Sequence, residues 1–312
     1  RAELSDRSRS VVLLTIDTLR ADHVGCYAGE DEDSLTPNID RLAHDGRRFE
    51  NAVTPIVVTD PSHASMLTGL YPAEHGVIRN AVPLEPDVTT VAEVFRAAGY
   101  RTGAAVSVEH MNAQRSGLSQ GFDVYYDRGY HDRFRYHAGW KMMPRPRKNR
   151  MFAHERSAVE ANECALRFLG TVDDGPFFLW VHYFEPHTPY VGSDGDVFGE
   201  DDRAALEGAA ARGEAADLAA RAAALYRDEV RRADAAFGEL LAALEARGLL
   251  SELAVVIVSD HGEHMAEERL EPSLWFGHSD VYDEACRVPL IVGVPDERDP
   301  EVISEQVCTK DI

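Results

Sequence analysis

Residues 11–22 read VVLLTIDTLRAD, and this stretch decides the fold. Its first part, residues 11–16, is a continuous apolar run, which is typical of a strand covered on both faces of a parallel sheet. Similar short runs at residues 177–181 and 253–258 alternate with helical patterns along the chain. This alternation predicts an α/β fold in which a mostly parallel central sheet carries helices on both faces.

Residues typical of helix boundaries support this fold class. Pro37 and Gly46 bracket a short helix. Thr90 and Glu93 form a capping box that opens a second helix. A long amphipathic helix is predicted before the strand at 253–258, because its apolar residues recur at three and four positions. These residues are Val230, Ala233, Phe237, Leu240 and Leu244. A further strand is predicted at residues 288–294.

Composition restricts the class of protein. With 312 residues, 44% of them apolar, the chain can bury a full core, and its length suits one large catalytic domain over residues 1–312. The 54 acidic and 32 basic residues give a net charge of -22, so nucleic acids and anionic membranes are not expected as partners. No segment approaches the roughly 18 apolar residues of a membrane span. Residues 1–10 lack the apolar stretch of a secretory signal, so we expect a cytoplasmic protein unless the N-terminus has been trimmed.

Residues 128–150 form a basic island in this acidic chain, with arginine and lysine interleaved with aromatic residues. Two interpretations remain open: a solvated insertion that balances local charge, or a rim that attracts an anionic substrate. The acidic composition itself fits either a salt-adapted cytoplasm or a GC-rich genome. The oligomeric state leaves no signal in the sequence.

Two motifs place polar side chains where a nucleophile could be activated. Asp17 directly follows the first strand, and in open α/β sheets ligands and metals collect at the carboxyl ends of strands. An Asp in such a place is also a common cap or turn residue. The second motif reads TDPSHASMLTGLYP from Thr59 to Pro72. Its Pro61 suits a helix start, so Thr59 is expected just before a helix N-terminus, where an alkoxide or anion is favoured. A metal that lowers its pKa would make this hydroxyl a nucleophile, whereas the simpler interpretation is a helix cap.

Three further motifs contain histidine. Asp260 and His261, in SDHGE after the strand at 253–258, offer an oxygen and an imidazole to one divalent ion. Of His182 and His187, one is expected to be structural, and His187, in a loop between two prolines, is the expected proton donor to a leaving oxygen. His278 is either a second metal ligand, a phosphate contact or an ordinary surface histidine.

Taken in this order, the motifs resemble those of the sulfatase family of the alkaline phosphatase superfamily over residues 11–312. Members of this family carry an Asp-Asp pair after the first strand, Cys/Ser-x-Pro-Ser-Arg before Leu-Thr-Gly, then Pro-His-x-Pro and Ser-Asp-His-Gly-Glu. The resemblance implies a three-layer sandwich like that of alkaline phosphatase. It also implies that the chain stops before a smaller C-terminal subdomain, which is either removed or absent.

The departures from the family pattern bear on the reaction. Thr59 stands at the position of the formylglycine precursor, and threonine cannot be converted to formylglycine. Thr18 replaces the second Asp and His63 replaces the Arg. Arylsulfatases carry a Lys-x-His pair that aligns with Ser107 and Glu109, so two sulfate-contacting cations are missing here.

What remains of the motif set resembles the phosphodiesterases and phosphoglycerol transferases of the superfamily. The implied metal ligands are Asp17, Thr59, Asp260 and His261. An imidazole ligand favours Mn²⁺, Zn²⁺ or Mg²⁺ over Ca²⁺, with one ion, or two if His278 is also a ligand. The resemblance places His63 and Asn80 in contact with the substrate, and Thr59, His187 and His278 in the catalytic set.

The sequence therefore predicts a metal-dependent hydrolase that acts on small anionic esters by double displacement. Thr59 would attack phosphorus or sulfur, His187 would assist the leaving oxygen, and water would cleave the Thr59 ester. Phosphate monoesters or diesters are favoured over sulfate esters. Two alternatives stay open: a transferase of the phosphoglycerol or phosphoethanolamine type, and a catalytically silent protein that binds anions.

Overall fold

The computed structural model describes residues 9–28, 33–127, 155–173, 175–210, 212, 214–267, 276–278, 280–295 and 300–312. The basic aromatic insertion expected at residues 128–150 lies outside these described residues.

A central sheet of nine strands organises the described part of the chain, in the order β11-β2-β12-β8-β1-β5-β3-β4 with β13 paired to β2. Its strands are β1 (Ser10–Ile16), β2 (Arg47–Val53), β3 (Arg101–Ala105), β4 (Val124–Tyr126), β5 (Phe177–Tyr183), β8 (Leu253–Ser259), β11 (Arg287–Val288), β12 (Leu290–Gly293) and β13 (Glu301–Cys308). Two small antiparallel pairs lie beside it: β6 (Tyr190–Val191) with β7 (Val197–Phe198), and β9 (His264–Met265) with β10 (Phe276–Gly277).

The first strand lies in the middle of this sheet, as its apolar run predicts. β1 pairs in parallel with β5 on one side and with β8 on the other. Successive side chains of a strand point to opposite faces, so Leu14 and Ile16 enter one core and Leu13 enters the other. Both faces are buried, which explains why the strand is apolar throughout.

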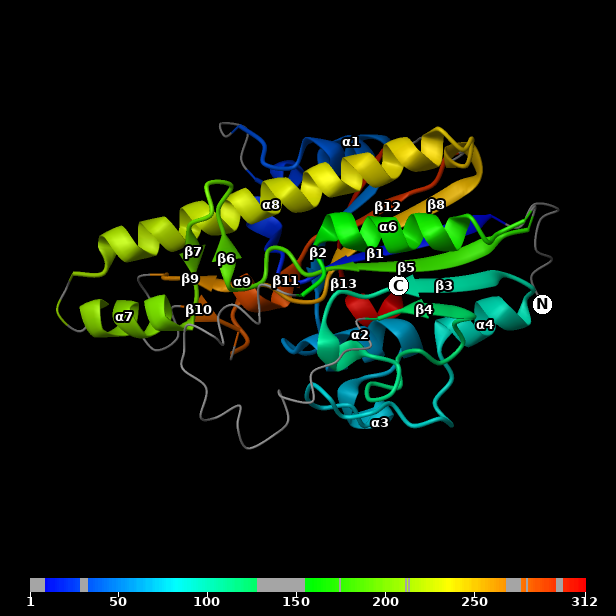
Figure 1. Cartoon of the computed structure of the whole chain (residues 1–312), viewed down its shortest axis with the longest axis horizontal. Helices are drawn as coiled ribbons and strands as arrows, with labels where there is room; N and C mark the ends of the chain where they lie inside the picture. The colour runs from blue at the N-terminus through cyan, green and yellow to red at the C-terminus, as the bar shows by residue number, and fades with distance from the viewer. Residues whose placement is uncertain are drawn as a thin grey trace.

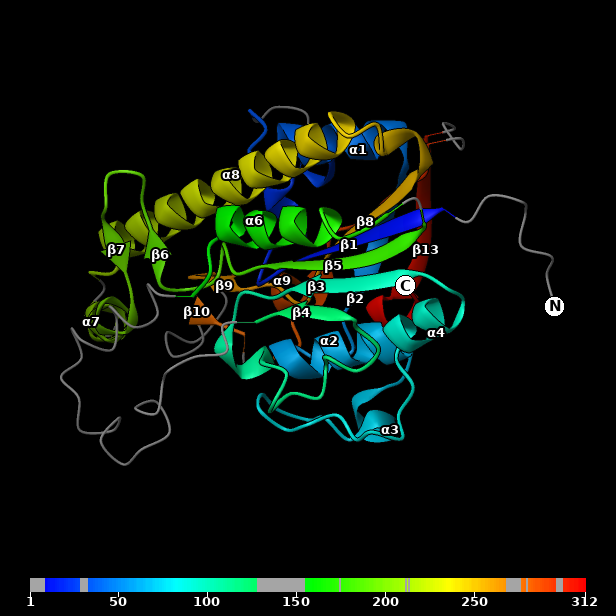
Figure 2. The same cartoon turned by 45° about the vertical axis from the view of Figure 1, so that its right-hand side comes forward.

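Helices cover both faces of the sheet (Figures 1 and 2). One layer contains α1 (Pro37–Asp45), α6 (Ala158–Leu169) and the long α8 (Ala216–Glu245), and the other contains α2 (Thr59–Thr68), α3 (Pro72–His75) and α4 (Val91–Ala97). The remaining described α-helices are α7 (Glu200–Ala210) and α9 (Asp283–Cys286). This arrangement confirms the expected sandwich of a mostly parallel sheet between helical layers.

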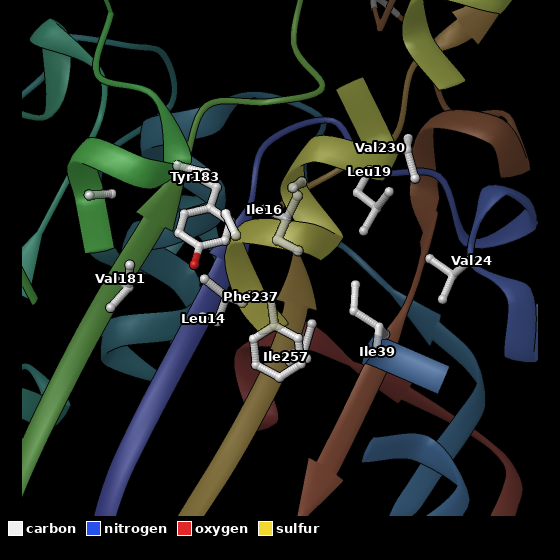
Figure 3. Close-up of a cluster of buried hydrophobic side chains, with 14 of the residues drawn as sticks. Leu14, Ile16, Leu19, Val24, Ile39, Val181, Tyr183, Val230, Phe237 and Ile257 are labelled. Atoms are coloured by element: carbon white, nitrogen blue, oxygen red, sulfur yellow. The ribbon is translucent and has the colours of Figure 1, made fainter. Parts of the chain in front are cut away.

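The core between the sheet and the first helical layer fixes the position of β1. In Figure 3, Leu14 and Ile16 lie in one cluster with Phe237 and Val230 of α8 and with Ile39 of α1. Fully burying one such side chain contributes about 1.5–3 kcal/mol. Because Ile16 is the last residue of β1, this packing also fixes the residue that follows it at the edge of the sheet.

The predicted helix boundaries agree with the structure. α1 begins at Pro37 and is followed by Gly46. α4 begins after Thr90, whose hydroxyl accepts a hydrogen bond from the Glu93 amide while the Glu93 carboxylate accepts one from the Thr90 amide.

The strand predicted at residues 288–294 differs in two respects. Pro289 cannot donate a backbone hydrogen bond, and it stands between β11 and β12. Both segments also run antiparallel to their neighbours, so this end of the sheet is mixed.

None of the helices in the described ranges combines the length and apolarity that a membrane crossing requires.

Candidate active site

Two adjacent strands end at the same edge of the sheet, and each is followed by an acidic residue. Asp17 comes directly after β1, and Asp260 and His261 come directly after β8. Because β1 and β8 are parallel with Ile16 opposite Ser259, the residues that follow them lie side by side. Metal-ligating atoms of Asp17, Asp260 and His261 all lie within 4.8 Å of one another. The structure thus brings together three of the four residues expected to hold a metal ion.

These three side chains fit a divalent cation. Each is buried, and within the described part of the chain Asp17 Oδ1, Asp260 Oδ2 and His261 Nε2 have no hydrogen-bond partner. An unpartnered buried polar atom is costly, so three of them gathered in one place indicate a site for a ligand that the protein itself does not supply. Two carboxylates with one imidazole suit Mn²⁺, Zn²⁺ or Mg²⁺.

The local charge also favours a cation. Burial, followed by the charges of Asp260 and Glu263, raises the pKa of Asp17 well above its usual range. Glu263 is itself buried close to these groups. A divalent ion would stabilise the ionised carboxylates that burial and mutual repulsion disfavour.

Backbone groups orient the candidate ligands. Asp260 Oδ1 accepts hydrogen bonds from the amides of Thr18 (3.1 Å) and His261 (2.8 Å), which leaves Oδ2 directed elsewhere. His261 Nδ1 donates to the carbonyl oxygen of Gly262 at 3.0 Å, so its Nε2 carries the lone pair that a metal needs. A Cβ atom on Gly262 would overlap the carbonyl oxygen of Glu284, so this position requires glycine because of a close backbone approach.

Thr59 lies at the start of α2, and the first turn of that helix is tied to the same strand ends. The helix begins at Thr59 with Val58 as its N-cap, one residue earlier than expected. Ser62 Oγ donates to the carbonyl oxygen of Asp260 at 2.8 Å. His63 Nδ1 donates to the carbonyl oxygen of Thr59 at 2.8 Å and lies 3.9 Å from Asp260 Oδ2. The first turn of α2 and the candidate metal site therefore belong to one cluster, near the positive end of the helix dipole.

Two further histidines lie beside this cluster. His278 Nδ1 donates to the carbonyl oxygen of Val57 at 2.7 Å, two residues before Thr59, and the His278 ring centre is 4.1 Å from that of His261. The His187 ring centre is 6.2 Å from that of His278. The structure thus places His278 next to His261, and His187 beside His278.

His187 was expected to be the proton donor, but its ring is neutral near pH 7 in this structure. Burial, followed by the nearby His278, lowers the pKa of His187 to about 3. Its Nδ1 donates to the carbonyl oxygen of Thr188 at 2.5 Å, so near neutral pH the ring is neutral and Nε2 presents a lone pair. A negative charge bound beside the ring would oppose this shift.

Of the two expected substrate contacts, His63 is buried and Asn80 is exposed. His63 is buried and uses both ring nitrogens within the protein, because its Nε2 accepts from the Thr15 hydroxyl at 3.0 Å. It therefore orients α2, and a contact with a substrate would require one of these two hydrogen bonds to break. Asn80 is exposed, and its Oδ1 accepts from the amide of Asp60, the residue after Thr59, at 2.9 Å.

Three residues that support the site had no clear signal in the sequence. His182 Nε2 lies 3.6 Å from Asp17 Oδ2, and the amide of Ser107 donates a hydrogen bond to His182 Nδ1. Tyr226 of α8 donates its hydroxyl to the carbonyl oxygen of Thr18 at 2.8 Å. For His182, the sequence indicated only that one of two histidines, His182 or His187, is structural. Tyr226 gave no signal, because it continues the apolar face of a helix.

Comparison with known proteins identifies the family of this chain. The sequence model of the Sulfatase family matches residues 9–312. An ulvan-active sulfatase of Formosa agariphila is 28% identical over 97% of this chain and 60% of its own length. Human arylsulfatase A is 28% identical over 98% of this chain and 63% of its own length. The chain therefore spans roughly three fifths of the length of these relatives.

Solved structures show the same fold. The phosphonate monoester hydrolase of Agrobacterium radiobacter superposes with a TM-score of 0.70 at 21% identity, covering 98% of this chain and 72% of that chain. A putative sulfatase of Bacteroides fragilis gives a TM-score of 0.69 at 21% identity, covering all of this chain and 73% of the other. At these identities the likeness concerns the fold alone. Because the family match extends over almost the whole sequence, this chain belongs to the sulfatase family.

Proposed function

We propose that this chain is a metal-dependent hydrolase that cleaves phosphate or sulfate esters through Thr59. One observation carries the proposal: Asp17, Asp260 and His261 aim unpartnered ligand atoms at one place, beside the first turn of the helix that begins with Thr59. The named activities of relatives support the reaction class, since they include sulfatases and a phosphonate monoester hydrolase.

Asp17, Asp260 and His261 would hold the ion, together with the Thr59 hydroxyl. A bound divalent ion would supply positive charge that lowers the pKa of the Thr59 hydroxyl and offsets the charge of the ester oxygens. The N-terminus of α2 adds backbone N–H groups that favour the same anion.

The proposed reaction has two displacements. In the first, the Thr59 hydroxyl loses its proton to solvent, and its oxygen forms a bond to phosphorus or sulfur while the bond to the leaving oxygen breaks. The bound anion raises the pKa of His187, which takes a proton from solvent and gives it to the leaving oxygen. In the second, water attacks the same centre and the bond to the Thr59 oxygen breaks. One proton of the water passes to that oxygen and restores the hydroxyl, and the other goes to solvent.

Phosphate esters are the favoured substrates. The formylglycine route of sulfatases is closed to threonine, because Thr59 has no thiol or primary alcohol that could be oxidised to an aldehyde. A plain hydroxyl nucleophile instead leaves an ester of Thr59 that water must cleave. A phosphomonoester or phosphodiester is therefore proposed ahead of a sulfate ester.

Thr59→Ala tests the nucleophile. The variant should lose at least about a thousandfold in kcat, because the bond-forming atom is removed. Initial rates on aryl phosphates, diesters and sulfates, each with Mn²⁺, Zn²⁺, Mg²⁺ and Ca²⁺, measure this effect.

Thr68→Ala is the matched control. Thr68 lies at the other end of α2 and donates its hydroxyl to the carbonyl oxygen of Ala64 within the helix, so its loss should leave kcat unchanged. Full activity of Thr59→Ala would refute the proposed role.

A further inference from the structure

His182 is a polar residue inside a fully buried strand. Every position of β5 is buried, and the residues before His182 are aromatic or aliphatic. A buried imidazole is costly unless its polar atoms are paired. Yet Nε2 of His182 has no hydrogen-bond partner among the residues that the structure describes. An unpaired polar atom in the middle of the sheet calls for an explanation other than packing.

Strand pairing places His182 beside Asp17. In the parallel pair of β1 and β5, His182 lies opposite Thr15. Side chains two positions apart on a strand share a face, so Asp17 follows Thr15 on the face that His182 also occupies. The Asp17 amide donates to the carbonyl oxygen of Tyr183 at 3.0 Å, which continues the pairing one step beyond β1. His182 Nε2 accordingly lies 3.6 Å from Asp17 Oδ2.

Ser107 decides which ring nitrogen of His182 carries the proton. Its backbone amide donates to His182 Nδ1 at 3.4 Å. Because an amide can only donate, Nδ1 presents its lone pair, and the proton of the neutral ring is on Nε2. Ser107 is itself fixed, since its carbonyl oxygen accepts from the Arg156 amide at 3.1 Å and its hydroxyl donates to the His182 carbonyl oxygen. His182 therefore presents an N–H group to Asp17.

The two carboxylate oxygens of Asp17 face different surroundings. Asp17 belongs to the candidate metal site with Asp260 and His261, and its Oδ1 is buried and unpaired within the described ranges. Its Oδ2 faces His182. The separation of 3.6 Å is longer than a hydrogen bond, but the last torsion of aspartate is soft, so a small rotation of the carboxylate would close it. A donor on Oδ2 fixes the plane of the carboxylate and leaves Oδ1 to a cation.

We infer that His182 is a positioning residue of the candidate metal site, whose Nε2–H group holds Asp17 Oδ2 and directs Oδ1 to the ion. The inference rests on the proposed function for the presence of the ion. His182 acts only through Asp17, and Ser107 acts only by setting the tautomer of His182.

The rival interpretation is purely structural, with His182 filling β5 and fastening the segment after β3 through Ser107. Two substitutions divide the two contacts of the ring. His182→Asn keeps an acceptor for the Ser107 amide and loses the donor at the position of Nε2. His182→Gln places its amide donor near the position of Nε2 and loses the acceptor at Nδ1. A structural role predicts that asparagine is the better substitute, whereas a positioning role predicts that glutamine binds the ion better.

Calorimetric titration of the full chain with Mn²⁺ measures the affinity for the ion without turnover. His182→Asn should bind Mn²⁺ about ten- to a hundredfold more weakly, the usual effect of losing a hydrogen bond to a metal ligand. His182→Gln should stay within a few fold of the wild type in Mn²⁺ affinity, and its Tm should fall because the Ser107 amide loses its acceptor. Ion affinity and stability are thus expected to fall in different variants.

The same two substitutions at His75 are the matched control. His75 is also buried, its Nδ1 accepts from the Val77 amide at 3.1 Å, and its Nε2 therefore donates to Ser65 Oγ at 3.0 Å. The same kind of contact sets the same tautomer, but the N–H group is directed at a hydroxyl of α2 and not at a candidate ligand. His75→Asn and His75→Gln should both keep the Mn²⁺ affinity of the wild type.

A second measurement needs no variant. In histidine-labelled wild type, ¹H–¹⁵N correlation spectra of the imidazole rings report which nitrogen is protonated. The proton of His182 is expected on Nε2 both in the presence of a chelator and in the presence of Zn²⁺. A proton on Nδ1 overturns the inference even if the His182 variants do not fold.

The outcomes separate this inference from the proposed function. Equal Mn²⁺ affinities in His182→Asn and His182→Gln, or the higher affinity in His182→Asn, overturn the inference whether or not the wild type hydrolyses esters. Mn²⁺ binding that depends on His182 in a protein without turnover refutes the proposed hydrolase and supports the inference. A wild type that binds none of Mn²⁺, Zn²⁺, Mg²⁺ and Ca²⁺ overturns both.

Discussion

Thr18 has a backbone conformation that a β-branched residue rarely adopts, with a φ of 54°. The conformation directs its amide to Asp260 Oδ1 and its carbonyl oxygen to the hydroxyl of Tyr226. Its own hydroxyl is buried and has no hydrogen-bond partner among the residues that the structure describes. Backbone strain and an unsatisfied hydroxyl beside the candidate ligands are typical of a functional site.

Thr18→Val should make the chelated protein more stable by about 1 kcal/mol, because it removes an unsatisfied buried hydroxyl and keeps the branched shape. Urea denaturation in the presence of a chelator measures the change. Thr15→Val is the matched control: Thr15 is equally buried, but its hydroxyl oxygen accepts from the Trp180 ring and contacts His63 Nε2. That control should lose stability, and an equal loss in both variants would contradict the account of Thr18.

The residues of the site differ in how far the sequence could predict them. Asp17, Asp260 and His261 directly follow apolar runs, so their place at one edge follows from local pattern and the rules of parallel sheets. The Ser107–His182 contact joins residues 75 positions apart, and the Thr18–Tyr226 contact joins residues 208 positions apart. No local pattern encodes such contacts, so they required the structure.

Among the elements, α8 connects the core to the candidate metal site. Its apolar face was predicted from residue spacing, and Phe237 and Leu240 are buried as expected. On the same helix, Tyr226 donates to the carbonyl oxygen of Thr18 and accepts from the amide of Arg20. The helix thus holds the segment that follows Asp17 as well as packing on the sheet.

Tyr226→Phe should lower the affinity for Mn²⁺ by about ten- to a hundredfold, the usual effect of removing a group that orients metal ligands. Calorimetric titration with Mn²⁺ measures it. Tyr183→Phe is the control, because Tyr183 is equally buried and donates to Asn162 Oδ1, away from the candidate ligands. Equal Mn²⁺ affinities in the two variants would show that α8 has no influence on the site.

Strands and helices also differed in how well local sequence determined them. α1 has proline at its first position and α4 has a capping box, so their boundaries were predictable from a few positions. β2 carries charged and half-buried residues and exists through its pairing with β12 and β13, strands more than 200 positions later. Its stabilising partners are non-local, and the antiparallel course of β12 depends on the same pairing.

For the whole molecule, net charge and the candidate metal site are connected. The chain carries a net charge of -22, and three of its acidic residues, Asp17, Asp260 and Glu263, are buried at the sheet edge. Without a cation, the desolvation and mutual repulsion of these groups lower the free energy of unfolding. Binding of a divalent ion should therefore be measurable as global stability.

At a concentration of Mn²⁺ near one hundred times its Kd, the ion should stabilise the wild type by about 2.7 kcal/mol. For a chain of this length that corresponds to an increase of about 4 °C in Tm. Asp260→Asn should lose this increase, because it removes a candidate ligand. Asp234→Asn should have a lower Tm with and without Mn²⁺ but keep the increase, since Asp234 is also buried and instead accepts from the amides of Asn38 and Ile39 in α1. Calorimetric scans of the three proteins with Mn²⁺ and with a chelator measure these Tm values. An undiminished Tm increase in Asp260→Asn would show that the ion binds elsewhere.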